Sequence, residues 1–82
     1  MKVEIITDDS NEHSQSAIEL LMDRNVLHTE IKMGDSPEQA FEIMRKYGWH
    51  TLPMVFVDGE PIGGLAELQN MIEEIVGGRK NT

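Results

Sequence analysis

Apolar residues recur along this chain at the spacings of helices and strands, and they predict an alternating α/β fold. In the segment 11–24, Ala17, Ile18 and Leu21 lie three and four positions apart, as on one face of a helix. The run Val3–Ile6 is short and rich in β-forming residues. Along the whole chain the same patterns predict elements over Val3–Ile6, Asn11–Arg24, Leu27–Met33, Pro37–Tyr47, Met54–Val57, Glu60–Ile62 and Leu65–Val76. Their order is β-α-β-α-β-β-α.

Local signals indicate where these elements begin and how the strands pair. Ser36 fits an N-cap, Pro37 the first helical position, and Gln39 completes a capping box. The pair Asp58-Gly59 between two strands predicts a two-residue hairpin, and Pro61 confines the last strand to a sheet edge. Strands joined through a helix pair in parallel, and the hairpin adds an antiparallel pair. We therefore expect a four-stranded mixed sheet flanked by three helices.

Length and composition limit the chain to a small domain with few classes of partner. Its 82 residues supply one core, so we expect one domain over residues 1–78 and a disordered tail over residues 79–82. The net charge of −8 disfavours binding to nucleic acid and to anionic membrane surfaces. No apolar run approaches the ~20 residues that span a bilayer, and the first residues do not form a signal peptide.

The chain has no cysteine, and this absence removes several kinds of chemistry. Disulfides, thiolate catalysis and cysteine-ligated metals are all excluded. We take a cytoplasmic location as the default, and we expect a monomer.

The segment Thr51–Gly64 carries the most informative motif. It contains Thr51-Leu52-Pro53, an apolar strand, the hairpin pair Asp58-Gly59, a short strand and Gly63-Gly64. These features at these offsets resemble the glutaredoxin family, and the element order agrees over essentially the whole chain. The resemblance implies a thioredoxin fold for the domain 1–78.

The resemblance also implies a ligand groove. In the family the proline that matches Pro53 is cis, and the backbone at Leu52 is placed to bind an extended peptide such as glutathione. The helix that follows Gly63-Gly64 holds a glutathione carboxylate at its N-terminus. Two acidic residues often follow these glycines in the family, but here Glu67 alone remains, which weakens recognition of the glutathione amino group. A purely structural turn at Gly63-Gly64 is the alternative.

Aligned with the family, the two redox cysteines fall at Asn11 and Ser14. The first thiol of that motif is activated at a helix N-terminus, where Asn11 offers only a carboxamide and a good N-cap. An unactivated serine hydroxyl such as that of Ser14 is a poor nucleophile. The charges also differ, since Asp8 stands where the family commonly has lysine, and Glu12 lies inside the loop. Carboxylates there would raise the pKa of a thiol and repel an anionic ligand.

Histidines and aromatic residues offer weaker candidates. His13 and His50, with Asp8 or Glu12, form the composition of a two-histidine, one-carboxylate metal site, but nothing in their spacing is specific, and we predict no metal. We expect Tyr47 to pack in the core. Trp49, the single tryptophan, either covers the loop or anchors a protein partner.

Three functional hypotheses remain open from the sequence. The first is a redox-inactive glutaredoxin-like domain that binds glutathione or a peptide non-covalently in the Pro53 groove, without any other cofactor. The second is a glutathione-dependent thiol–disulfide oxidoreductase, or electron donor, whose cysteines were replaced. The third is a non-redox subunit that binds a larger protein through the face around Trp49 and Pro53.

Overall fold

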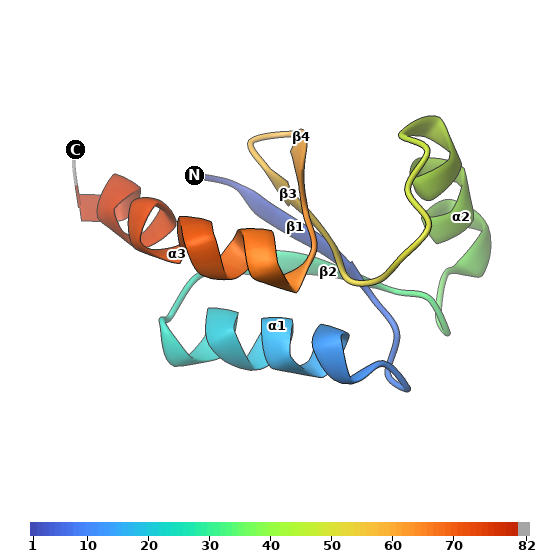
Figure 1. Ribbon diagram of the computed structural model, residues 1–82, viewed down its shortest axis with the longest axis horizontal. Coiled ribbons are helices and arrows are strands. Elements are labelled where there is room, and N and C mark those ends of the chain that lie inside the picture. The colour runs from blue at the N-terminus through green and yellow to red at the C-terminus, as the bar shows by residue number, and fades with distance from the viewer. Residues whose placement is uncertain (81–82) are drawn as a thin grey trace.

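The computed structural model describes residues 1–80, which form four strands and three helices in the predicted order (Figure 1). The strands are β1 Val3–Thr7, β2 His28–Lys32, β3 Met54–Val57 and β4 Glu60–Gly63. The helices are α1 Glu12–Asp23, α2 Pro37–Lys46 and α3 Leu65–Lys80. None of these helices, within residues 1–80, is long and apolar enough to cross a membrane.

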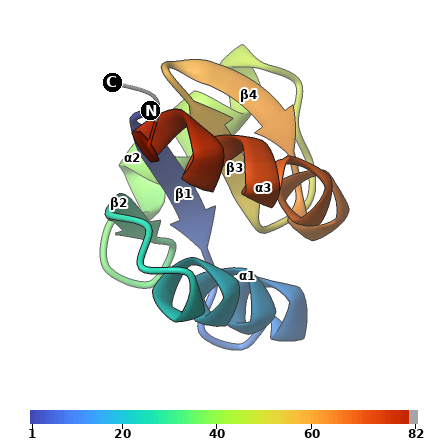
Figure 2. The same ribbon diagram turned by 90° about the vertical axis from the view of Figure 1, so that its left-hand side faces the viewer.

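The four strands form one mixed sheet in the order β2-β1-β3-β4, which Figure 2 shows from the side. Strand β1 pairs with β2 in parallel and with β3 antiparallel, and β3 pairs with β4 antiparallel. The mixed sheet predicted from the element order is confirmed. Strand β4 lies at an edge, so the missing N–H of Pro61 interrupts no ladder on its outer side.

The core is divided between the two faces of the sheet because side chains of β1 alternate. Ile5 packs with α1 and α3 residues such as Leu21 and Leu68, while Ile6 packs with α2 residues such as Met44. Helices α1 and α3 therefore cover one face and α2 covers the other, as Figure 1 shows. All of Ile5, Ile6, Leu21 and Leu68 are fully buried.

Turn residues place the connections as the sequence indicated. Asp58 and Gly59 both have positive φ, 53° and 84°, as a tight hairpin turn between right-twisted strands requires. Asn25, at φ 57°, follows the end of α1. The Leu52–Pro53 peptide bond, which leads into β3, is cis.

Three local predictions need correction. The capping box of α2 does not form: Ser36 occupies the N-cap position, but its side chain makes no capping hydrogen bond. Its backbone, at φ −139° and ψ 62°, departs from the extended conformation typical of that role. Tyr47 is 40% exposed, because it follows the last turn of α2 and meets Phe56 edge-on at the rim of the sheet, with ring centroids 5.5 Å apart. The second strand begins at His28, and Leu27 is 88% exposed.

Helix α3 is longer than its apolar pattern indicated. The prediction ended it at Val76, before two glycines, and assigned residues 79–82 to a tail. The helix continues to Lys80, since glycine lowers helix propensity by only about 1 kcal/mol and does not by itself end a helix. The remainder of the predicted tail, residues 81–82, lies outside the described residues.

Candidate functional site

The loop between β1 and α1, which aligns with the missing cysteines, is closed by its own hydrogen bonds. The backbone N–H of Asn11 donates to the carbonyl of Asp8 at 2.9 Å. The side-chain Oδ1 of Asn11 accepts the N–H of Ser14, also at 2.9 Å, and so caps α1 as predicted. The carboxamide oxygen of Asn11 is therefore engaged in the N-cap hydrogen bond of α1.

Ser14 has a structural role that its sequence position did not reveal. The residue is 1% exposed, and its Oγ accepts the backbone N–H of Asp8 at 3.1 Å. A buried acceptor of this kind satisfies a backbone donor that would otherwise be unpaired. The hydroxyl thus holds the loop against α1 and does not reach solvent, which adds to the reasons against Ser14 as a nucleophile.

Carboxylates dominate the electrostatics of the loop. The carboxylate of Asp8 accepts the N–H of Ser10 at 3.0 Å and its hydroxyl at 2.8 Å. These bonds, the backbone one foremost, lower the pKa of Asp8 against a small opposing effect of desolvation. Asp9 lies 4.0 Å from the ammonium of Lys32, and Glu12 is exposed in the first turn of α1. Asp8 and Glu12 thus place two carboxylate side chains beside the N-terminus of α1.

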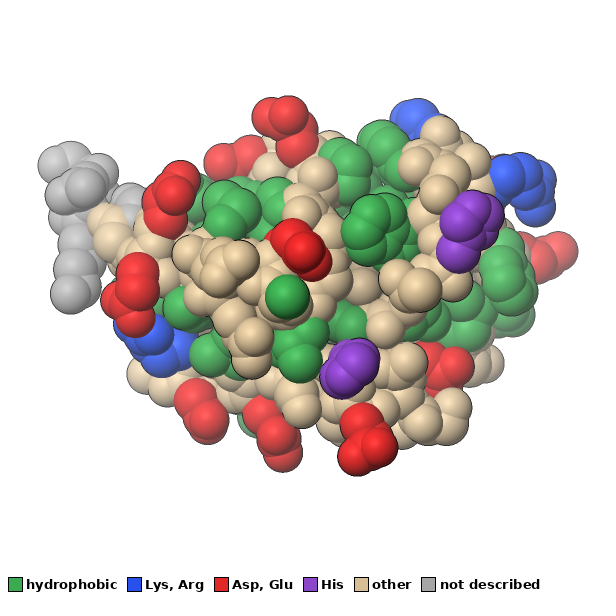
Figure 3. Space-filling model, in the orientation of Figure 1, with side chains coloured by type: hydrophobic (Ala, Val, Ile, Leu, Met, Phe, Trp, Pro, Cys, Tyr) green, Lys and Arg blue, Asp and Glu red, His purple; other side chains and the backbone are tan. Residues whose placement is uncertain are grey.

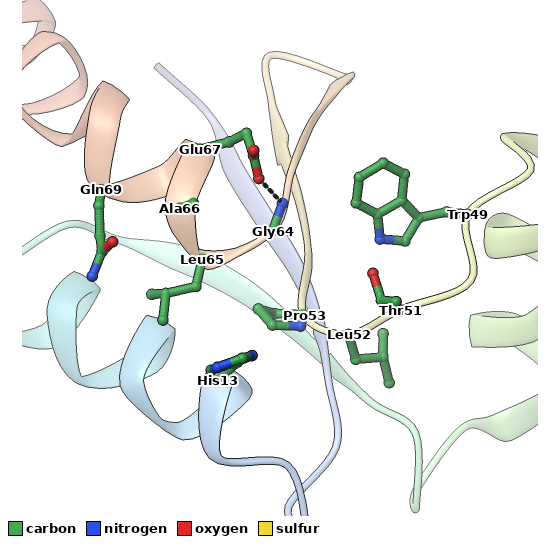
Figure 4. Close-up of a pocket in the computed structure, with 10 residues that line it drawn as sticks. All are labelled: His13, Trp49, Thr51, Leu52, Pro53, Gly64, Leu65, Ala66, Glu67 and Gln69. Atoms are coloured by element: carbon green, nitrogen blue, oxygen red, sulfur yellow. Dashed lines mark hydrogen bonds between the residues drawn. The ribbon is translucent and has the colours of Figure 1, made fainter.

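A groove of about 480 Å³ lies next to this loop and is centred on Pro53 (Figure 4). It is lined by His13, Trp49, Thr51, Leu52, Pro53, Gly64, Leu65, Ala66, Glu67 and Gln69. These residues come from the first turn of α1, the loop before β3 and the first turns of α3, as Figure 4 shows. We call it the Pro53 groove. It brings together four of the five residues that the sequence assigned to ligand binding, and Gly63 stands just outside its lining.

Leu52 contributes unpaired backbone to the Pro53 groove. Its N–H and C=O make no hydrogen bond with any residue that the structure describes. Strand β3 begins two residues later, at Met54, so Leu52 lies just beyond the ladder that satisfies the strand. Free donor and acceptor groups at this point are open to an added extended segment.

The start of α3 is capped by its own side chain. The N–H of Gly64 donates to Oε1 of Glu67 at 2.8 Å, the dashed contact in Figure 4. Gly63 has φ 130°, and Gly64 approaches the carbonyl oxygen of Pro53 so closely that a Cβ would lie 3.3 Å from it. Glycine is therefore favoured at residue 63 by its positive φ and at residue 64 by the close approach to Pro53. The side chain of Glu67 bonds the N–H at the helix start, where the resemblance placed a ligand carboxylate.

A second groove of about 510 Å³ adjoins the first. It shares His13, Thr51 and Leu52 with the Pro53 groove and extends toward α2, where Phe41 is 55% exposed. Its full lining is Asp8, Asn11, His13, Met33, Phe41, Met44, His50, Thr51 and Leu52. We call it the α2 groove. The apolar stripe predicted for α2 thus belongs partly to this surface and not wholly to the core.

Trp49 forms part of the wall between α2 and the Pro53 groove. Its ring packs against the α2-side core, yet its indole Nε1 is buried without a hydrogen-bond partner among the described residues. In Figure 4 the ring stands beside Thr51 at the margin of the groove. Trp49 is therefore packed against the core on the α2 side of the sheet, and it is also placed to contact an occupant of the Pro53 groove.

Metal binding receives no support from the arrangement of histidines and carboxylates. His13 and His50 both line the α2 groove with Asp8. Within the part of the chain that the structure describes, however, no three His, Asp or Glu side chains assemble into a group that could hold a metal ion.

Several residues of the site were not found from the sequence. Leu65 and Gln69 line the Pro53 groove from α3, and Met33 lines the α2 groove. The only signal for Leu65 was its position directly after the glycine pair. On the face shown in Figure 3, hydrophobic side chains reach the surface in the middle, carboxylates surround them, and the Lys and Arg side chains in view lie toward the margins.

Comparison with known proteins identifies the family. The sequence profile of the family described as glutaredoxin matches residues 3–62. Among solved structures, glutaredoxin 1 from Francisella tularensis, complexed with cacodylate, has a TM-score of 0.76 at 24% identity, covering 93% of this chain and 96% of its own. The dithiolic glutaredoxin 2-C-Grx1 from Trypanosoma brucei brucei has a TM-score of 0.76 at 26% identity, covering 93% and 82%.

A third similar structure is the glutaredoxin-like protein NrdH-redoxin from Escherichia coli, described by its thioredoxin-like activity profile. Its TM-score is 0.75 at 22% identity, and the match covers 90% of this chain and 93% of that one. No curated protein matches the chain. The element order, the mixed sheet and the match over residues 3–62 agree, and the chain belongs to the glutaredoxin family.

Proposed function

We propose that this protein is a redox-inactive glutaredoxin-family module that holds an extended peptide in the Pro53 groove without forming a covalent bond to it. The observation that carries the proposal is the contrast between the loop and the groove. The residues in place of the cysteines, Asn11 and Ser14, are engaged in structural hydrogen bonds. The groove beside them remains open, with unpaired backbone at Leu52.

Redox inactivity follows from the chemistry of the residues. Dithiol–disulfide exchange needs a thiolate that attacks one sulfur and releases another. The chain has no cysteine, and neither a carboxamide nor a buried serine hydroxyl has an equivalent reduced and oxidised state. Purified protein should give no turnover of hydroxyethyl disulfide with glutathione and its reductase. A rate above the uncatalysed background, in a preparation free of contaminating enzyme, would contradict this part of the proposal.

Non-covalent binding follows from the unpaired backbone and the apolar walls. An extended segment that pairs with Leu52 gains main-chain hydrogen bonds, and Pro53 and Leu65 offer apolar contact to its side chains. Because Trp49 lines the groove and is the only tryptophan, its fluorescence reports directly on occupancy. Titration with short extended peptides, and with glutathione as the smallest of them, should change this signal saturably. A flat response to all of them would contradict binding.

A further inference from the structure

We propose that the Pro53 groove selects a cationic peptide, in which an apolar side chain lies among Trp49, Pro53 and Leu65 and flanking Lys or Arg residues face the carboxylates around it. This inference rests on the proposed function, because it names the ligand class of the same groove. It also predicts that glutathione is not the preferred ligand, since glutathione carries two carboxylates and one ammonium group and is a net anion at neutral pH.

The first observation is the charge around the grooves. Neither the Pro53 groove nor the α2 groove is lined by Lys or Arg within residues 1–80. Glu67 lines one groove and Asp8 the other, while Glu12 adjoins His13 in a smaller hollow at the start of α1. Glu67, from the start of α3, and Asp8, from the loop before α1, thus each line a groove that contains Thr51 and Leu52, and Glu12 lies beside His13, which both grooves share. Complementary potentials of this kind select a partner by the sign of its charge.

The second observation is the state of the α3 N-terminus. A helix start with free N–H groups attracts anions. Here the carboxylate of Glu67 already accepts the N–H of Gly64 at 2.8 Å. A ligand carboxylate would have to displace Glu67 or lie next to its negative charge, and both are unfavourable. The protein's own side chain therefore already occupies one donor, the N–H of Gly64, that an anionic peptide would use.

The third observation points to an extended, partly apolar occupant. The N–H and C=O of Leu52 are unpaired within the described residues, independently of any charge. The neighbouring walls are apolar at Trp49, Pro53 and Leu65, and the adjoining α2 groove adds the exposed ring of Phe41. A free ion or a polyamine would satisfy the carboxylates but not the backbone or these walls, so the groove fits a peptide with both features.

A set of matched peptides tests the proposal. Peptides of about seven residues, roughly 23 Å when extended, share a central leucine and differ only in whether Lys, Gln or Glu flanks it. Affinity is measured through Trp49 fluorescence and by calorimetry. The lysine peptide should bind most tightly, with affinity falling about two- to fivefold for each flanking charge replaced by Gln. The glutamate peptide and glutathione should bind more weakly still, and salt should reduce the preference.

Variants separate local charge from the overall negative charge of the protein. Asp8→Asn, Glu12→Gln and Glu67→Gln each keep a side-chain oxygen acceptor while removing the charge. Each should weaken the lysine peptide by about two- to fivefold without weakening the glutamine peptide. The matched control is Glu74→Gln, an exposed carboxylate on α3 that lines neither groove nor the hollow at the start of α1, and it should leave the preference unchanged.

Each outcome bears on the proposal. If the glutamine peptide binds as tightly as the lysine peptide, or if glutathione binds more tightly than either, charge selection is overturned while the proposed function stands. If Glu74→Gln acts as strongly as the groove variants, the preference reflects net charge and the local assignment fails. If no peptide binds, the proposed function and this inference both fail. The comparison of the three peptides on the unmodified protein tests charge selection even where a variant does not fold.

Discussion

Replacing Asn11 tests whether the loop between β1 and α1, which aligns with the family's cysteines, now contributes to the stability of the fold. Asn11→Ala removes the Oδ1 that accepts the Ser14 N–H at 2.9 Å and leaves that donor without its capping partner. Loss of an Asn N-cap costs about 1 kcal/mol, within a range of roughly 0.5–2 kcal/mol. A loss of about 1 kcal/mol lowers the melting temperature of a domain of this size by about 4–8 °C. The change should also shift the urea midpoint by about 0.5–1 M.

The assay is urea unfolding followed by circular dichroism, with Asn11→Asp as the matched control. Aspartate keeps the acceptor and places a negative charge at the N-terminus of α1, although Asp8 and Glu12 already lie nearby. Its stability should therefore stay within about 0.5 kcal/mol of the unmodified protein. If Asn11→Ala is as stable as Asn11→Asp, the capping role is wrong, and Asn11 does not serve folding in place of the lost thiol.

Three further changes test the rest of the loop. Ser14→Ala removes the buried acceptor of the Asp8 N–H and should cost about 1–3 kcal/mol in free energy of unfolding, whereas the exposed Ser16→Ala should cost nothing, and equal effects would refute the structural role. Because hydrogen bonds lower the pKa of Asp8 in the folded state, its carboxylate stabilises the fold above its ordinary pKa and loses this effect as the pH falls through the lowered value. The difference in free energy of unfolding between the unmodified protein and Asp8→Asn should therefore shrink as the pH falls from about 7 to about 2. A difference that stays constant over this range would contradict the stabilising role of the Asp8 carboxylate. Asn11→Cys with Ser14→Cys should give weak disulfide reductase activity that rises toward about pH 9 and increases further with Asp8→Lys, because the neighbouring carboxylates hold the new thiol near its free pKa of ~8.5. A folded but inactive double variant would mean that more than the thiols has been lost.

The sequence predicted those features that depend on neighbouring residues. The hairpin at Asp58-Gly59 needs two positive φ angles, and Asn11 caps the helix that begins directly after it, so local chemistry was sufficient in both cases. The edge position of Pro61 followed from its missing donor. The residues of the Pro53 groove were found chiefly because the Thr51–Gly64 motif resembled a family.

Features that depend on tertiary packing could not be predicted from the sequence. Ser14 was judged by its reactivity, but its burial and its bond to the Asp8 N–H arise only when the loop folds back onto α1. Glu67 was assigned to a ligand, yet it first satisfies the N–H of Gly64 in its own helix. Tyr47 has helical spacing with core residues, but the helix ends before it, which leaves the ring at the rim.

Mapping the binding site by amide chemical shifts is the most direct test of the central claim that the Pro53 groove binds an extended peptide non-covalently. With isotope-labelled protein and the lysine peptide, we expect saturable, reversible shifts concentrated at Leu52, Gly64 and the indole N–H of Trp49. Dilution or high salt should reverse them, and no covalent adduct should appear by mass spectrometry. Shifts confined to the separate pocket around Tyr47 and Gly59, or the absence of any shift at saturating peptide, would contradict non-covalent binding in the Pro53 groove.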